Sequence, residues 1–184
     1  MPNFLDITTS LVLKDELSMQ QIESVAELIN KVYLITESDF WPQNGSYERT
    51  NALEITQFIA KKELIIARIE EEIVGAVHIY PVKDDVCGFG MLVSSPEKRG
   101  AGIGRMLMKS IEDWAMMNTY KIIQLELLKP INYLHPDKEF LKGWYTKLGY
   151  RIISKTSYGD LYPNQASLLK IPCNFEIYQK NLIN

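Results

Sequence analysis

The sequence predicts a mixed α/β fold with helices on the faces of a sheet. Two amphipathic helical segments come first, and the hydrophobic pattern then changes to the shorter period of strands. Residues 85–128 have the pattern of a strand, a helix and a strand, which implies a parallel pair joined by a right-handed crossover. This order of elements is typical of helices packed on a mixed sheet. The chain has 184 residues, 46% of them apolar, so we expect residues 1–184 to form a single domain.

The first predicted helix covers residues 18–34. Ser18 followed by Gln21 is the pattern of a capping box, which satisfies backbone N–H groups at a helix start. Apolar side chains then recur at helical spacing: Ile22, Val25, Ala26, Leu28, Ile29 and Val32. A turn-rich aromatic stretch, 36–51, leads into a second amphipathic helix over 52–62.

The middle of the chain predicts three strands separated by short polar turns. Strands this close in sequence form an antiparallel meander most simply. They cover 64–72, 72–82 and 85–93. The rest of the chain predicts a helix from Ile103 to about Met117, a strand over 121–128, a helix over 140–149 and strands over 150–157 and 173–182.

Composition argues against several classes of protein. The net charge of −3 and the lack of a basic stripe disfavour nucleic acid as a partner. Cys87 and Cys173 have no partner motif, so we expect neither a disulfide framework nor a metal site. There is no run of 18 apolar residues and no signal-peptide pattern. We therefore expect a cytoplasmic protein that does not bind membranes.

Residues 93–108, VSSPEKRGAGIGRMLM, place three glycines where the central helix begins. The free N–H groups of a first helical turn, together with the helix dipole, attract anions. Glycines let a ligand approach the backbone because no Cβ stands in the way. The segment therefore predicts a phosphate-binding turn, although a glycine-rich turn that binds nothing would have the same pattern.

Two common phosphate-binding motifs do not fit this turn. A P-loop needs Lys and then Ser or Thr after its last glycine, whereas Arg105 and Met106 follow Gly104. A dinucleotide-binding fingerprint needs a third glycine where Arg105 stands, and its glycines come directly after a strand. Here residues 94–99 separate the strand from Gly100.

Residues 99–104, RGAGIG, resemble the acyl-CoA signature of the GNAT acetyltransferase superfamily, Gln/Arg-x-x-Gly-x-Gly/Ala. Residues 144–150, WYTKLGY, resemble that superfamily's FYxKxGF motif, and the order of elements is similar over most of the chain. The resemblance implies a mostly antiparallel sheet of about six to seven strands with a central, splayed parallel pair. It also implies acetyl-CoA as co-substrate.

The resemblance further implies which residues would contact CoA. Amides of the 99–105 segment would hold the pyrophosphate, and the pantetheine arm would pair with the backbone of 91–93. At the position of a common CoA-contacting asparagine this chain has Lys138, which we expect to meet a CoA phosphate instead. The expected CoA-binding residues are Met91, Leu92, Val93, Arg99, Gly100, Ala101, Gly102, Ile103, Gly104, Arg105 and Lys138.

Acetyl transfer from a thioester to an amine needs a neutral amine and benefits from a proton donor to the departing thiolate. Tyr145 stands where the family places the tyrosine that protonates the sulfur. The resemblance also implies that a backbone N–H near Leu92 contacts the thioester oxygen.

The general base stays open. In the strand over 121–128, alternation puts Glu126 on the face opposite Leu125 and Leu127, and desolvation of this acid could raise its pKa. A hydrogen-bonded structural role for Glu126, or a base that acts through water, is an alternative. His78 has the pattern of a packed strand histidine, and Cys87 has no histidine–acid pair to make it a nucleophile.

Acceptor sites in this family are built from segments that correspond to 36–51 and 156–169. Acids beside aromatic side chains there would suit a cationic amine. They are Glu37, Asp39, Glu48 and Asp160 together with Phe40, Trp41, Tyr47, Tyr158 and Tyr162. We therefore expect direct transfer of an acetyl group, in a ternary complex, to a primary amine of a small molecule or peptide.

The alternative function is a non-catalytic module that binds or senses acyl-CoA. The identity of the acceptor, the use of other acyl groups and the choice between monomer and homodimer stay open.

Overall fold

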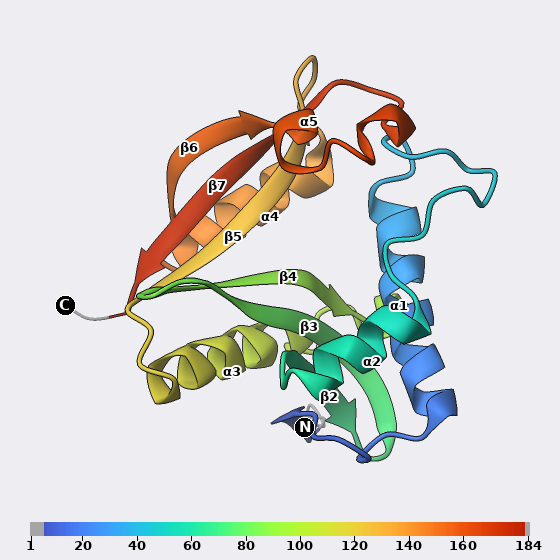
Figure 1. Ribbon diagram of the computed structural model, residues 1–184, viewed down its shortest axis with the longest axis vertical. Coiled ribbons are helices and arrows are strands. Elements are labelled where there is room, and N and C mark those ends of the chain that lie inside the picture. The colour runs from blue at the N-terminus through green and yellow to red at the C-terminus, as the bar shows by residue number, and fades with distance from the viewer. Residues whose placement is uncertain (1–5, 183–184) are drawn as a thin grey trace.

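The computed structural model describes residues 6–182, in which seven strands form one sheet (Figure 1). The strand order is β1-β2-β3-β4-β5-β7-β6. The strands are β1 (Ile7–Leu11), β2 (Leu64–Ile69), β3 (Glu72–Lys83), β4 (Val86–Ser94), β5 (Ile122–Pro130), β6 (Arg151–Ser157) and β7 (Cys173–Asn181). Among these seven described strands only β4 and β5 are parallel, and the other neighbours are antiparallel. The predicted mixed, mostly antiparallel sheet is confirmed.

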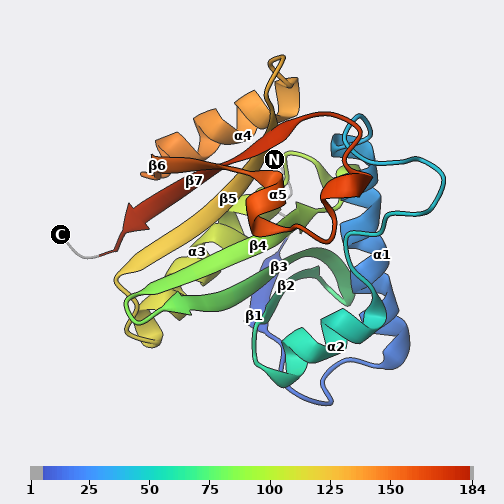
Figure 2. The same cartoon turned by 45° about the horizontal axis from the view of Figure 1, so that its top comes forward.

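Helices cover both faces of the sheet, as predicted (Figure 2). The helices are α1 (Met19–Thr36), α2 (Ala52–Ala60), α3 (Ile103–Met117), α4 (Pro136–Lys147) and α5 (Tyr158–Leu161). Buried side chains of α1 and α2 pack together with one face, and those of α3 and α4 with the other. The capping box of α1 is present, because Ser18 accepts from the Gln21 amide and Gln21 accepts from the Ser18 amide.

The parallel pair separates partway along its length. β4 and β5 pair only from Val86–Ile122 to Phe89–Leu125. Beyond that point β4 stays with β3, and β5 stays with β7. Figure 1 shows the two halves of the sheet diverging from there. The expected splayed pair is therefore confirmed, and it opens the sheet on the side where α1 and the β4–α3 turn lie.

A β-bulge occurs in β4 just after this separation. Gly90 lies opposite His78 and Val93 lies opposite Ala76, so two residues of β4, at 91 and 92, lie opposite the single residue 77 of β3. Met91 has φ of 52°, a left-handed conformation that is uncommon for residues other than glycine. Bulges re-aim the backbone and are frequent next to active sites. The bulge interrupts the hydrogen-bond ladder between β3 and β4, in the part of β4 that no longer pairs with β5.

The elements that differ from the predictions lie at the edges of the fold. β1 was not predicted, because its central residues are the polar Thr-Thr-Ser; it forms by pairing with β2. α4 starts at Pro136, four residues before the predicted start at 140. Proline at the first helical position and an acid next to it, Asp137, are start signals that the prediction did not use. α5 and two 3₁₀ turns, Pro96–Lys98 and Ala166–Leu168, were also not predicted.

Candidate active site

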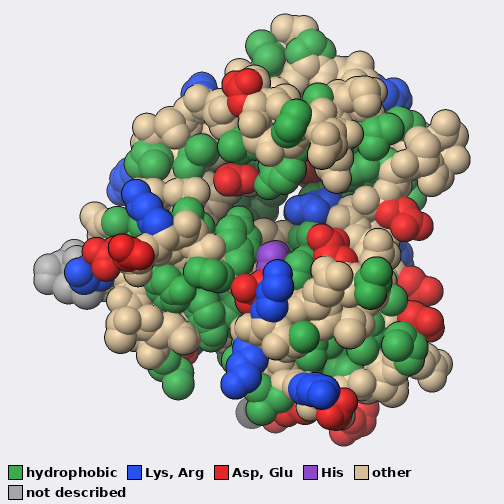
Figure 3. Space-filling model, in the orientation of Figure 1, with side chains coloured by type: hydrophobic (Ala, Val, Ile, Leu, Met, Phe, Trp, Pro, Cys, Tyr) green, Lys and Arg blue, Asp and Glu red, His purple; other side chains and the backbone are tan. Residues whose placement is uncertain are grey.

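A cavity of about 1040 Å³ lies where β4 and β5 separate (Figure 3). One end is formed by the β4–α3 turn and the first turns of α4. The other end is formed by α1, the segment between α1 and α2, β3 and the α5 region. The wall between them is the bulged part of β4 and residues 125–128 of β5. One continuous space thus connects the glycine-rich turn with the aromatic end of the molecule.

The glycine-rich turn leaves its backbone open to this cavity. Gly100 and Gly102 have φ of 85° and 92°, and Gly102 is the N-cap of α3. A Cβ at either position would meet no heavy atom within 4 Å. The turn is therefore uncovered at both glycines, and a helix start that is open in this way can receive an anion.

Most of the expected CoA-binding residues line the cavity, and one lies elsewhere. The cavity wall includes Met91, Leu92, Val93, Arg99, Gly100, Ala101, Gly102, Gly104, Arg105 and Lys138. The side chain of Ile103 instead belongs to the core, with 2% exposure. Ile103 can therefore face a ligand only through its backbone.

The two sequence motifs meet at Gly104. The ring of Trp144, from the WYTKLGY motif, lies 3.4 Å from the place where a Cβ of Gly104 would stand. A Cβ at Gly104 would thus be in van der Waals contact with Trp144 of α4, whereas Gly100 and Gly102 face open space. This packing brings α4 and its Tyr145 to the same cavity as the glycine turn.

Tyr145 is buried in the cavity wall, with 5% exposure. Its ring packs near Phe89 and Trp144, with centroids 6.0 and 5.1 Å away. Burial raises the pKa of the Tyr145 phenol above its ordinary value of 10.0. The phenol therefore stays protonated at neutral pH and is available as a hydrogen-bond donor.

Glu126 faces the cavity from β5, on the side opposite the core residues Leu125 and Leu127. Its Oε2 accepts a hydrogen bond from the Tyr162 hydroxyl at 3.3 Å. Burial raises the pKa of Glu126, while that hydrogen bond and the charge of Arg49 act in the opposite direction. The predicted strand alternation is confirmed, and it places a carboxyl of raised proton affinity in the cavity.

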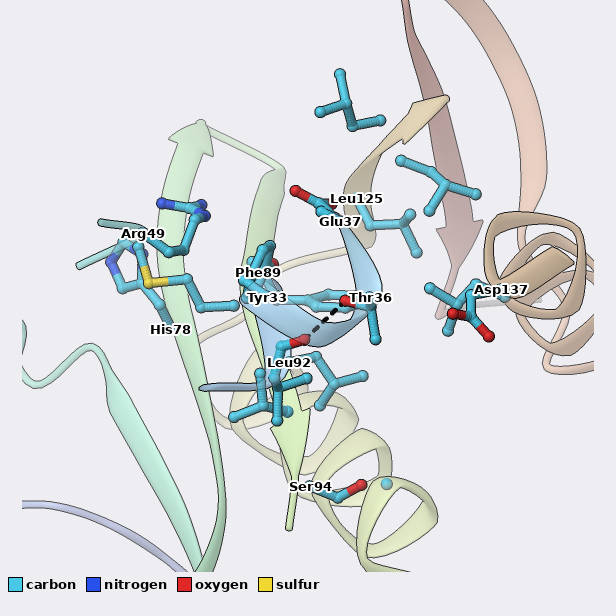
Figure 4. Close-up of a pocket in the computed structure, with 18 of the residues that line it drawn as sticks. Tyr33, Thr36, Glu37, Arg49, His78, Phe89, Leu92, Ser94, Leu125 and Asp137 are labelled. Carbon is cyan, nitrogen blue, oxygen red and sulfur yellow. Dashed lines mark hydrogen bonds between the residues drawn. The ribbon is translucent and has the colours of Figure 1, made fainter. Parts of the chain in front are cut away.

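His78 lines the same cavity from β3 (Figure 4). Its ring stacks on Phe58 with centroids 3.7 Å apart, and its Nε2 lies 3.2 Å from Glu63 Oε2. Burial lowers the pKa of His78, although the contact with Glu63 acts in the opposite direction. His78 is thus a packed strand histidine, as predicted, and it also lines the cavity.

Lys138 has a different partner from the one that the sequence led us to expect. Its Nζ forms an ion pair with Glu37, and both residues are buried, with 5% and 3% exposure. The other oxygen of Glu37 accepts from Trp41 Nε1 at 2.7 Å. The charge of Lys138 is therefore compensated within the protein, by the C-cap residue of α1, and it is not a free cation awaiting a CoA phosphate.

The aromatic end of the cavity, where the resemblance implies the acceptor site and which we call the acceptor end, differs from the expectation in its charges. Trp41, Tyr47, Tyr158 and Tyr162 line the cavity, as the resemblance implied, but Phe40 does not. Of the four acids named there, only Glu37 lines the cavity. Asp39, Glu48 and Asp160 are exposed outside it. Several lining residues were not predicted: Tyr33, Arg49, Glu54 and Tyr80. Of these four, Arg49 could have been singled out from the sequence, because it is the single basic residue of 36–51.

Other chemistry has little support within the described residues. Cys87 is fully buried in the core, its Sγ lies 3.7 Å from the Ile122 carbonyl, and burial raises its pKa to about 11. Among residues 6–182, His, Cys, Asp and Glu form no group of three suited to a metal ion. Within the same residues, none of the helices combines the length and the apolar character needed to cross a bilayer.

Comparison with known proteins places this architecture in a family. A family model described as "Acetyltransferase (GNAT) domain" matches residues 60–152. No curated protein matches the chain.

Solved structures match over nearly the whole chain. An aminoglycoside 6′-N-acetyltransferase complexed with coenzyme A is 17% identical, with a TM-score of 0.69 over 96% of this chain and 98% of that one. The putative acetyltransferase yncA from Salmonella typhimurium, solved with acetyl-CoA, is 10% identical (TM-score 0.66, 97% and 95% coverage). Ard1 from Thermoplasma volcanium is 14% identical (TM-score 0.65, 97% and 99% coverage). Since the family model covers half of the sequence and these folds match the rest, the chain belongs to the GNAT superfamily of acetyl-CoA-dependent acetyltransferases.

Proposed function

We propose that this protein transfers the acetyl group of acetyl-CoA directly to a primary amine within a ternary complex. The observation that carries the proposal is the single cavity that joins the open glycine turn to Tyr145 and Glu126. A donor bound along the turn and an acceptor bound at the aromatic end would meet where β4 and β5 separate. Holding the two reactants together in this way supplies much of the rate of such a reaction.

In this proposal the donor is bound mainly by backbone. Amides at the start of α3 hold the pyrophosphate, with Arg99 and Arg105 beside it on the cavity wall. The backbone of 91–93, which has left β5 and is bulged against β3, pairs with the pantetheine arm. The N–H of Leu92 donates to the thioester oxygen, where negative charge develops during attack.

Two side chains take part in the proton transfers of this reaction. As the amine nitrogen bonds to the carbonyl carbon and the C–S bond breaks, Glu126 accepts the proton that the amine loses. Tyr145 donates a hydrogen bond to the departing sulfur, because its buried phenol stays protonated. Acetyl-CoA supplies the activated acyl group, and the chain supplies binding, orientation and these two proton contacts.

Replacing Gly102 with valine is expected to weaken acetyl-CoA binding about tenfold or more, measured by calorimetry. The new side chain would stand in the open space before the amides and block hydrogen bonds to the charged phosphates. A β-branched residue is also strained at φ of 92°.

Gly45→Val is a matched control for that strain. Gly45 also has a left-handed φ, 79°, with open space at its Cβ, but it does not line the cavity. We expect Gly45→Val to keep its affinity for acetyl-CoA. An equal loss in both variants would show that strain, not access to the amides, causes the effect.

Glu126→Gln is expected to remove the acid limb of the pH profile of kcat/KM. A protonated glutamic acid cannot accept the amine proton, so activity is lost as the pH falls through the pKa of Glu126. Because burial raises that pKa, the limb should lie above the ordinary glutamate value of about 4.3. His78→Gln is the comparison variant, and it should keep the acid limb. If the acid limb disappears in His78→Gln and persists in Glu126→Gln, His78 is the general base instead of Glu126.

The proposal as a whole is tested by thiol release from acetyl-CoA over a panel of amines and peptides, together with calorimetric binding of acetyl-CoA. Steady release with an acceptor supports catalysis. Binding without release from any acceptor would favour the alternative, a non-catalytic acyl-CoA-binding module. The absence of acetyl-CoA binding would contradict both.

A further inference from the structure

Arg49 is held in a fixed position at the acceptor end of the cavity. It lies two residues before the N-cap of α2, Asn51. The amides of Arg49 and Thr50 donate to Asn30 Oδ1 at 2.8 and 3.1 Å, and Asn30 Nδ2 donates to the Thr50 carbonyl at 2.8 Å. Asn30 of α1 thus fixes the backbone from which the Arg49 side chain extends. Figure 4 shows Arg49 and His78 on one side of the pocket and Asp137 on the other.

The Arg49 guanidinium has no counter-ion within the described part of the chain. Its Cζ lies 5.2 Å from the ring centroid of Tyr33, and its side chain is half-buried in the cavity wall. No carboxylate of residues 6–182 comes within 4.0 Å of it. Burial makes this charge costly. Tyr33 and the more distant carboxylate of Glu37 act in its favour, but neither forms an ion pair with it, so the guanidinium is available to an anion from outside the protein.

The acids near Arg49 do not fill that role. Glu37 is committed to Lys138 and to the indole of Trp41. Glu54, at the start of α2, accepts from the Thr50 hydroxyl at 2.6 Å. Glu126 is close enough for the charge of Arg49 to act on it, yet the two form no ion pair. At this end, away from Arg99 and Arg105 at the glycine turn, the cavity therefore presents Arg49 as an unpaired cation. Within its electrostatic reach lies the carboxylate of Glu126, whose one hydrogen bond among residues 6–182 is the long one from Tyr162.

This arrangement fits a molecule that carries an amine and a carboxylate. The amine would face Glu126 and the acetyl group, and the carboxylate would accept from Arg49. The guanidinium fork matches a planar carboxylate in a bidentate manner, better than a lysine ammonium could. We propose that the acceptor is a small amino-carboxylate, such as a free amino acid, whose carboxylate is bound by Arg49. This inference rests on the proposed acetyltransferase function and specifies its substrate class.

The experiment uses the native protein with acetyl-CoA and matched sets of acceptors. Each amino acid is compared with its primary amide, which keeps the size and removes the charge, and with its decarboxylated amine. We expect at least one amino acid to have kcat/KM about tenfold or more above that of both its matched compounds, as is usual for a charge-assisted bidentate contact.

Variants assign that preference to Arg49. Arg49→Gln should lower the ratio of the amino acid to its amide about tenfold, and Arg49→Lys should lower it less, because the charge is kept and the fork is lost. Arg151→Gln is the matched control. Arg151 donates to backbone carbonyls of Thr146 and Tyr150 outside the cavity, so its variant should keep the ratio. Melting temperatures close to that of the native protein would exclude unfolding as the cause.

The outcomes distinguish a failure of the proposed acetyltransferase function from a failure of the proposed substrate class. If acetyl-CoA does not bind, the proposed function fails and this inference fails with it. If amines or amides are acetylated as well as or better than the matched amino acids, the proposed function stands and the inference is overturned. Binding of acetyl-CoA without release by any amino acid of the panel also overturns it, because the panel contains the class that it names.

Discussion

Replacing Tyr145 with phenylalanine is expected to lower kcat about 10²-fold while leaving the affinity for acetyl-CoA nearly unchanged. General acid groups contribute about 10²–10⁴ to a rate. We expect the lower end, because burial raises the pKa of Tyr145, and complete transfer of its proton to a thiolate of pKa near 8.5 is unfavourable. The benefit is then mainly a hydrogen bond to the sulfur. The ring packing against Phe89 is kept in the variant.

Tyr150→Phe is a stringent control for this prediction. Tyr150 follows the same helix, its ring centroid lies 5.9 Å from that of Tyr145, and it is fully buried. Its hydroxyl is buried without a hydrogen-bond partner among the described residues, and it does not line the cavity. Removing this hydroxyl should leave kcat unchanged. If single-turnover rates fall equally in both variants, the effect of Tyr145→Phe comes from packing and Tyr145 has no proton contact with the sulfur.

The parts of the site that follow from local chemistry could be predicted from the sequence. The glycine turn is one of them, since a strand, three glycines and an apolar helix start are consecutive in the chain. The outward direction of Glu126 is another, because strand alternation fixes it. These features need only periodicity and backbone conformation.

The charges of the acceptor end could not be predicted, because they depend on contacts between distant segments. Lys138 lay outside the predicted helix, which began at 140, whereas in the structure it lies in the first turn of α4. There it reaches Glu37, 101 residues earlier in the chain. In the sequence Arg49 is one charge of a polar loop, and only the fold shows that no carboxylate of residues 6–182 forms an ion pair with it. Side-chain pairing across the cavity is a tertiary property that no local pattern contains.

Replacing Lys138 with methionine is expected to lower the free energy of unfolding by about 3–5 kcal/mol, the usual cost of leaving one charge of a buried pair uncompensated. Both side chains are at most 6% exposed, so Glu37 cannot be solvated without moving the end of α1. The pair joins α1 to α4, the helices that face each other across the cavity. Urea denaturation of the purified variant measures the change.

Two further variants isolate the charge of Glu37 as the cause. In the double variant Glu37→Gln/Lys138→Met the amide can still accept from Trp41 Nε1, so most of the stability should return. Lys121→Met removes a lysine whose pair with Asp85, at 3.3 Å, is more than half exposed, and it should cost less than about 1 kcal/mol. If Lys138→Met costs no more than Lys121→Met, water reaches Glu37 in the native protein. The pair between Lys138 and Glu37 would then contribute no more to stability than an exposed pair.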